Sequence, residues 1–129
     1  QLPLYREQVD SLLGLPESFR AGRTVLHYRE NALYIAMEAL ARNISEENLL
    51  HPVIRQLEAY DQAYNTEYLV TLKTYIHACY SKSGTSEALN IHRNTLAYRL
   101  EKIGEITCVN LRDPMTALHL LISFYYLDR

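Results

Sequence analysis

Side chains of the kinds that read nucleic-acid bases are concentrated in one stretch of this chain, residues 83–103. The candidate contact residues in it are His92, Arg93, Asn94, Thr95, Tyr98 and Arg99. In the DNA major groove, arginine can donate a pair of hydrogen bonds to guanine, and asparagine can form a pair with adenine. We therefore expect Arg93 and Asn94 to contact bases, and His92 to contact a base or a phosphate.

The other three candidates suit the sugar–phosphate backbone better than the base edges. Hydroxyl and guanidinium groups donate readily to phosphate oxygens, and such contacts fix the position of a protein on the duplex. Thr95 could instead cap the helix locally. For Tyr98 and Arg99, packing within the domain is an alternative of about equal weight, and the sequence leaves it open.

The residues around these candidates follow the pattern of two helices joined by a sharp corner. Ser83 is expected to cap a first helix that continues to Leu89. Asn90 then supplies the corner, because asparagine tolerates the left-handed backbone conformation that such a turn needs. Ser86 is small enough for the second helix to approach the first closely at that point.

A second helix is predicted over about 93–103, with Gly104 closing it as the left-handed glycine that often follows a helix. Apolar residues recur on one of its faces, at Leu96, Leu100 and Ile103. The candidate donors lie on the other face. This is the geometry of a helix-turn-helix, whose second helix enters the major groove. An ordinary helical hairpin with a polar outer face is the alternative.

The rest of the chain also favours helices, with one exception. We expect them at about 4–13, 30–42, 52–64, 65–80 and 114–127. Asn65 is expected to cap the fourth of these, and Asp113 with Pro114 to start the last. The exception is the run at about 23–28, which has β-branched and aromatic content. It is either a short residual strand whose sheet lies elsewhere, which we favour, or a merely extended segment.

The last predicted helix is apolar around nearly its whole circumference. Its apolar residues are Leu118, Leu120, Leu121, Ile122, Phe124, Tyr125, Tyr126 and Leu127. A helix of this kind is buried on more than one side. One side is expected to meet the core of its own domain. The other could meet a second subunit or be wrapped by the same domain.

Composition places the chain among ordinary globular proteins, with 129 residues of which 48% are hydrophobic and 22% charged. No run approaches the length of a membrane span, and no signal peptide is visible. The two cysteines fit a reducing cytoplasm and indicate neither a disulfide framework nor a zinc site. Because the first residue is Gln1, we expect a fragment of a longer protein.

The helix-turn-helix stretch carries a net positive charge, whereas the rest of the chain is net negative. The net charge of the whole chain is −2, but residues 82–102 carry +2 and the remainder carries −4. A small basic patch on an acidic body would bind DNA weakly as a monomer. We therefore expect a homodimer or higher oligomer, in which two copies act together.

Signals of an enzyme are missing from the sequence. There is no phosphate-binding glycine loop, no nucleophile elbow and no pair of histidines at metal-ligand spacing. We expect no catalytic residue, no cofactor and no metal. A small hydrolase would need a catalytic cluster that these residues do not form.

The motif IHRNTLAYRL, residues 91–100, resembles the signature of the C-terminal helix-turn-helix domain of PucR/CdaR-type bacterial transcriptional regulators. The flanking patterns Leu57-x-x-Tyr60-Asp61, Thr71-Leu72-x-x-Tyr75-Ile76 and Leu111-x-Asp113-Pro114 resemble the same family, so the likeness runs from about residue 51 to the end. Two positions depart from it: Ser86 stands where alanine is usual, and Ser81 stands where asparagine is usual. The core also resembles that of Fis-like helix-turn-helix domains.

The resemblance implies an all-α, multi-helix bundle that contains a helix-turn-helix and binds a double-stranded DNA operator. It implies that residues 51–129 are the DNA-binding domain, and that residues 1–50 are the end of a preceding sensor or GGDEF-like domain with a linker helix. A small-molecule effector would bind domains upstream, and the protein would act in the cytoplasm, away from membranes. The rival function is a helical interaction or dimerisation module without DNA binding.

Overall fold

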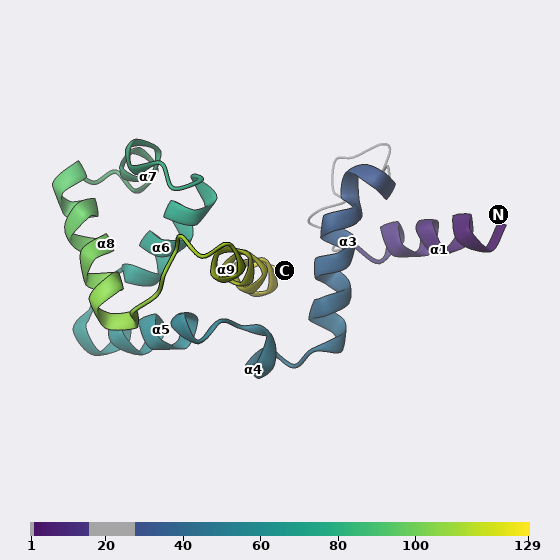
Figure 1. The fold of residues 1–129 in the computed structure, drawn as a ribbon, viewed down its shortest axis with the longest axis horizontal. Coiled ribbons are helices and arrows are strands. Elements are labelled where there is room, and N and C mark those ends of the chain that lie inside the picture. Colours follow the sequence, from purple (N-terminus) through teal and green to yellow (C-terminus); the bar gives the residue numbers. More distant parts are fainter. Residues whose placement is uncertain (1, 16–27) are drawn as a thin grey trace. The chain divides into compact units, whose positions relative to one another are not determined.

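The computed structural model describes residues 2–15 and 28–129, and every regular element within these residues is an α-helix (Figure 1). The helices are α1 (Leu2–Leu13), α3 (Tyr28–Asn43), α4 (Glu46–Leu49), α5 (Pro52–Tyr64), α6 (Tyr68–His77), α7 (Lys82–Leu89), α8 (Arg93–Thr107) and α9 (Pro114–Leu127). The all-α prediction is confirmed. Of the strand predicted at 23–28, residues 23–27 lie outside the described residues, and Tyr28 is the first residue of α3.

The chain divides into two compact units. Unit 1 comprises residues 1–49 and 125–129, and unit 2 comprises residues 50–124. The last helix belongs mainly to unit 2, and only its end is counted with unit 1. No helix among the described residues is long and apolar enough to span a bilayer. Whether residues 1–50 come from a preceding sensor domain stays a prediction.

Unit 1 is organised around a buried carboxylate on α3. Glu38 is 5% exposed, and its carboxylate accepts hydrogen bonds from Tyr125 Oη at 3.2 Å, from Arg42 Nε at 3.3 Å and from Arg129 Nε at 3.1 Å. A buried charge is tolerated when it is paired in this way. Burial and the neighbouring Glu38 carboxylate raise the pKa of Tyr125 to about 12.

Unit 2 has a core to which nearly every one of its helices contributes. Its most deeply buried apolar side chains are Val53, Ile54, Leu57, Leu72, Leu96, Ile103, Leu120 and Phe124. Each fully buried side chain of this size stabilises the unit by about 1.5–3 kcal/mol relative to exposure. The central helix is α6, which packs against α5, α7 and α8. The helix-turn-helix is therefore held from behind by this helix.

The start of α6 differs from the prediction. Asn65 does not cap a following helix but ends α5, with a left-handed φ of 53°. Glu67 occupies the cap position of α6, but its side chain makes no capping hydrogen bond. The cap is supplied by the carboxylate of Asp61 in the preceding helix: its Oδ1 accepts from the Tyr68 N–H at 2.9 Å, and its Oδ2 accepts from the Leu69 N–H at 3.0 Å. The hydroxyl of Thr66 adds a third hydrogen bond to Oδ1, at 2.6 Å.

The helices around the motif begin and end at other residues than the sequence predicts. Helix α6 ends at His77 rather than near residue 80, because Cys79 and Tyr80 both adopt left-handed φ values, 52° and 63°. Helix α7 then begins at Lys82, and its cap is Ser81 rather than the predicted Ser83. The Ser81 Oγ accepts from the Gly84 N–H at 3.0 Å. A serine hydroxyl thus supplies the cap at the position where the resembling family has asparagine.

Helix α8 runs one turn beyond its predicted end. Gly104 is not its left-handed cap but lies inside the helix, and residues 105–107 continue the helix beyond it. The helix ends at Cys108, whose φ is 54° and whose N–H donates to the Gly104 carbonyl at 2.9 Å. Thr107 supports this end by accepting a hydrogen bond from the Val109 N–H at 3.3 Å.

Helix α9 starts as predicted at Pro114, with Asp113 as its cap. The Asp113 carboxylate accepts from the backbone N–H of Thr116 at 3.1 Å and from its hydroxyl at 2.7 Å, and these hydrogen bonds lower its pKa. Leu120 and Phe124 are buried, whereas Met115 is 69% exposed. Leu118 and Leu121 are also exposed, so the part of α9 in unit 2 has a second apolar side facing outward.

The imidazole of His51 connects the two ends of unit 2. Its Nδ1 accepts from the Val53 N–H at 3.2 Å and so caps α5, while its backbone N–H donates to the Ser123 Oγ in α9 at 2.8 Å. The ring stands edge-on to that of His119, with the two centroids 4.9 Å apart. Burial, and to a lesser degree the neighbouring His119, lower the pKa of His51.

We expect this lowered pKa to make unit 2 less stable in mild acid. The unfolded chain binds a proton at His51 more readily than the folded chain, so this contribution is complete above the ordinary pKa of 6.5 and is lost as the pH falls below it. The measurement is the urea unfolding free energy at about pH 7.5 and pH 5.5. His51→Asn is the matched variant, because asparagine keeps a capping acceptor and does not titrate. A parent and a variant that lose equal stability over this range would contradict the expectation.

Candidate nucleic-acid interface

The corner between α7 and α8 has the geometry that the sequence predicts. Asn90 takes φ 53° and ψ 47°, and its N–H donates to the Glu87 carbonyl at 3.1 Å. The next N–H, of Ile91, donates back to the Ser86 carbonyl at 3.0 Å. Paired bonds of this kind satisfy the last carbonyls of a helix and end it sharply. Helix α8 therefore begins at Arg93, where it was predicted to begin.

The buried residue of α7 is one that sequence reasoning missed. Ser86 was expected to lie at the contact, but it is only half-buried. Thr85 is fully buried instead. Its hydroxyl donates to the Ser81 carbonyl at 2.7 Å, which satisfies the polar group and allows the side chain to be buried. Threonine is a polar residue type, and the carbonyl that satisfies its hydroxyl lies four positions earlier in the chain. The local sequence therefore gives little indication that Thr85 is buried.

The first turn of α8 is exposed and holds side chains that are not engaged by the protein. Arg93, Asn94 and Thr95 are all exposed. Within the described residues, none of their side chains has a hydrogen-bond or ion-pair partner. Their donors and acceptors are therefore free to meet a ligand, and they lie at the helix N-terminus, where the backbone N–H groups and the helix dipole favour anions such as phosphate.

His92 is the cap of α8. Its Nδ1 accepts a hydrogen bond from the Asn94 N–H at 3.1 Å, and its side chain is exposed. The capping bond occupies one ring nitrogen and fixes the ring at the start of the helix, which leaves Nε2 as the nitrogen available to a partner. The sequence predicts only a base or phosphate contact for His92 and does not indicate its capping role.

Arg99 does not join the exposed set. Its side chain is 18% exposed and is directed at α6. The guanidinium Nη1 donates to the Thr71 hydroxyl at 3.1 Å and lies 3.4 Å from a Glu67 carboxylate oxygen. Since both partners precede it by about thirty residues, no spacing near the motif could have indicated these contacts. The Arg99 side chain thus connects α8 to α6, the helix that packs behind it.

Tyr98 lies beside the first turn and is 55% exposed. The Lys102 ammonium lies 5.7 Å from the centroid of the Tyr98 ring and 3.2 Å from the Glu105 carboxylate, whose hydrogen bond raises the pKa of Lys102. A hollow of about 390 Å³ separates this surface from the α5–α6 loop, and its lining includes Thr66, Thr95 and Tyr98. The loop thus borders the candidate interface, which the sequence did not indicate.

Residues 68–125 match the family model of the PucR C-terminal helix-turn-helix domain. The matched range covers α6, α7, α8 and most of α9, and it contains all six candidate residues. It therefore includes both the corner at Asn90 and the helix that supports it from behind. No solved structure matches the chain with significance.

Three proteins of Bacillus subtilis (strain 168) are similar in sequence. The chain is 28% identical over 110 residues to the DNA-binding transcriptional activator AdeR, an alignment that covers 84% of this chain and 26% of AdeR. It is 36% identical over 74 residues to the proline-responsive transcriptional activator PutR, covering 57% of this chain and 18% of PutR. It is 40% identical over 55 residues to a purine catabolism regulatory protein, covering 43% of this chain and 10% of that protein.

The chain spans about a quarter or less of the length of each of these relatives. Together with the family match, these similarities confirm that residues 68–125 resemble the PucR-type helix-turn-helix domain that the sequence predicts. The alignment with AdeR is longer than the matched domain, so part of the likeness lies outside residues 68–125.

Proposed function

We propose that α8 is a recognition helix that reads a specific operator from the major groove, because residues 68–125 match the model of the PucR C-terminal helix-turn-helix domain. The observation that carries the proposal is the exposed first turn of α8, in which Arg93, Asn94 and Thr95 have no partner within the described residues. Side chains kept free at the N-terminus of such a helix are placed to meet base edges and phosphates.

Each residue of the turn receives a role from its surroundings. Arg93 contacts guanine and Asn94 contacts adenine, since their flat polar groups match those bases. His92 caps the helix through Nδ1 and offers Nε2 to a phosphate. Thr95 and Tyr98, beside the α5–α6 loop, contact the sugar–phosphate backbone.

Arg99 acts as a positioning residue in this proposal rather than as a DNA contact. Its hydrogen bond to Thr71 and its ion pair with Glu67 connect the middle of α8 to α6. The bond to a fully buried threonine hydroxyl fixes the side chain inside the domain. The first turn of α8 is thereby held at a defined angle to the rest of unit 2, and Arg99 has little freedom to reach a phosphate.

The charge distribution supports action as a homodimer or higher oligomer. Residues 82–102 carry a net charge of +2 on a chain with a net charge of −2, so a single copy attracts DNA only weakly. A second copy on an adjacent half-site would multiply the affinity without any new kind of contact. We further propose that the protein acts in the cytoplasm and that an effector binds outside this chain. We assign it no catalytic reaction, cofactor or metal.

One observation favours a second candidate function, a helical interaction module that does not bind DNA. The outward side of α9 in unit 2 exposes Met115, Leu118 and Leu121, and exposed apolar side chains that are grouped together mark surfaces that contact other proteins. The free donors on α8 argue against this module as the whole function, because an interaction surface of that kind has no need of them.

A selection of genomic DNA fragments with the full-length protein tests the proposed function. We expect a small set of fragments that share a repeated half-site, with half-sites about one helical turn apart or a multiple of it. Binding should weaken steeply with added salt, because phosphate contacts release counterions. A protein that is folded but enriches no fragment above the input would support the interaction module instead.

A further inference from the structure

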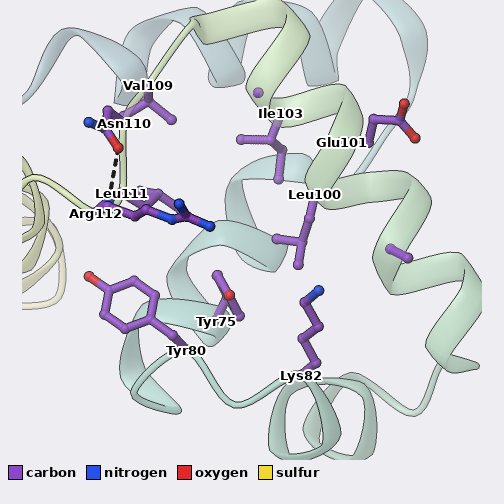
Figure 2. Close-up of a pocket in the computed structure, with 12 residues that line it drawn as sticks. Tyr75, Tyr80, Lys82, Leu100, Glu101, Ile103, Val109, Asn110, Leu111 and Arg112 are labelled. Atoms are coloured by element: carbon purple, nitrogen blue, oxygen red, sulfur yellow. Dashed lines mark hydrogen bonds between the residues drawn. The ribbon is translucent and has the colours of Figure 1, made fainter.

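A groove on unit 2 lies behind the recognition helix, and none of the six candidate DNA-contact residues lines it. Its volume is about 860 Å³, and it is bounded by the end of α6, the start of α7, one side of α8 and residues 109–112 (Figure 2). Leu100, Ile103 and Leu111 form its apolar part, and Tyr75, Lys82 and Arg112 supply polar groups. We call it the α8 groove. Its volume lies in the range of sites that hold small molecules, about 300–1,000 Å³.

Gly104 keeps one wall of the α8 groove open. It lies inside α8 and needs no left-handed backbone, and a Cβ built on it would meet nothing within 4 Å. Glycine in a helix interior destabilises the helix relative to alanine. No packing or backbone requirement explains that cost here. The open wall is what the glycine provides.

A strained turn shapes the opposite side of the α8 groove. Cys79 and Tyr80 are consecutive residues with φ values of 52° and 63°, which is costly for residues other than glycine. The turn sets the Tyr80 ring edge-on against Tyr75, with the centroids 5.4 Å apart, and both rings line the groove. Strain of this kind is retained where the surrounding structure needs it, and here it places an aromatic wall.

Two cations converge on the α8 groove. Figure 2 shows Lys82 extending into it from α7 and Arg112 extending into it from the 109–112 segment. Within the part of the chain that the structure describes, neither side chain has an ion-pair partner. The one carboxylate among the lining residues, Glu101, is directed away from both cations (Figure 2). Two unpaired positive groups above an apolar floor are complementary to an anion with an apolar body.

We propose that the α8 groove binds a small organic carboxylate with a hydrocarbon or aromatic body. The carboxylate meets Lys82 and Arg112, because a guanidinium can hold a carboxylate by two parallel hydrogen bonds. The apolar body lies along Leu100 and the open face at Gly104, between α8 and the two tyrosines. This site is separate from the exposed first turn of α8, and its existence does not depend on DNA binding.

Titration calorimetry of the 129-residue chain with octanoate tests the site, with octanol as the neutral ligand of equal chain length. We expect saturable binding of octanoate and binding of octanol weaker by at least about tenfold, the loss that removal of a charge-assisted hydrogen bond brings. The double variant Lys82→Gln/Arg112→Gln should weaken octanoate binding by at least about tenfold and leave octanol unchanged. Arg55→Gln, an exposed arginine outside the groove, is the matched control and should bind octanoate like the parent.

Gly104→Leu fills the α8 groove with a side chain that favours helix. It should abolish binding of both ligands while the circular dichroism spectrum stays helical. Should this variant fail to fold, the two glutamine substitutions, both at exposed positions, still decide the question. The proposal is overturned if octanoate fails to bind, if octanol binds as tightly, or if the double variant binds octanoate like the parent. A double variant that weakens every DNA sequence equally, in a parent that binds no octanoate, would assign the cations to DNA phosphates instead.

Discussion

Replacement of Arg93 by alanine is expected to weaken operator binding by about 1–3 kcal/mol and to relax the preference for one base pair. The guanidinium is exposed at the first residue of α8, and within the described residues it has no partner whose loss would unfold the domain. The effect should therefore be confined to DNA. Fluorescence anisotropy at one fixed salt concentration, on the operator and on copies with single base-pair changes, measures both quantities.

Arg93→Lys separates the two contributions of this residue. Lysine keeps the positive charge but lacks the planar pair of donors that matches guanine. We expect it to retain the affinity for unrelated DNA and to lose the base preference. An Arg93→Ala protein with an unchanged circular dichroism spectrum that binds the operator as tightly as the parent would disprove the contact.

Replacement of Asp61 by alanine is expected to lower the free energy of unfolding of unit 2 by about 2–3 kcal/mol. Its two carboxylate oxygens accept from the N–H groups of Tyr68 and Leu69 at 2.9 and 3.0 Å, and the Thr66 hydroxyl adds a third bond. Hydrogen bonds to an ionised group are stronger than neutral ones, and here three of them depend on one side chain. Because α6 supports both motif helices, its loosening should reach α8.

Urea unfolding followed by circular dichroism measures this effect. Asp61→Asn is the graded control, since its amide keeps one acceptor oxygen and should lose less stability than alanine. Asp10→Ala, at an exposed position of α1, should leave the unfolding of unit 2 unchanged. If Asp61→Ala and Asp10→Ala unfold at the same urea concentration, Asp61 is not the cap that holds α6.

The sequence predicts the ends of helices correctly where the capping residue is adjacent to the helix that it caps. Asn90 at the corner, the start of α8 after His92 and the start of α9 at Asp113 all followed from residue types within a few positions. The same chemistry was ambiguous at Asn65, because an asparagine that can start a helix can also end one in the left-handed conformation. The prediction for Gly104 was wrong for a related reason. Glycine often ends a helix, but here it lies inside α8, and the helix ends at Cys108.

Contacts between distant residues could not be predicted from spacing. Asp61 lies seven residues before the N–H of Tyr68 that it caps, and Arg99 lies 28 residues after Thr71. Asp61 is part of the Leu57–Asp61 pattern that resembles a known family, but that resemblance does not indicate that its carboxylate accepts hydrogen bonds from the start of α6. The α8 groove is drawn from four separate segments, so only the folded chain brings Lys82 and Arg112 together.

The most direct test of the account is a double-mutant cycle between Arg93 and the operator. Binding free energies are measured for the parent and for Arg93→Ala, each on the operator and on operators with single base-pair changes. If Arg93 contacts one guanine, the protein change and the change of that base pair will be strongly non-additive, and all other base pairs will be additive within about 0.5 kcal/mol. Additivity at every base pair would contradict the base contact of Arg93, through which α8 is proposed to read the operator.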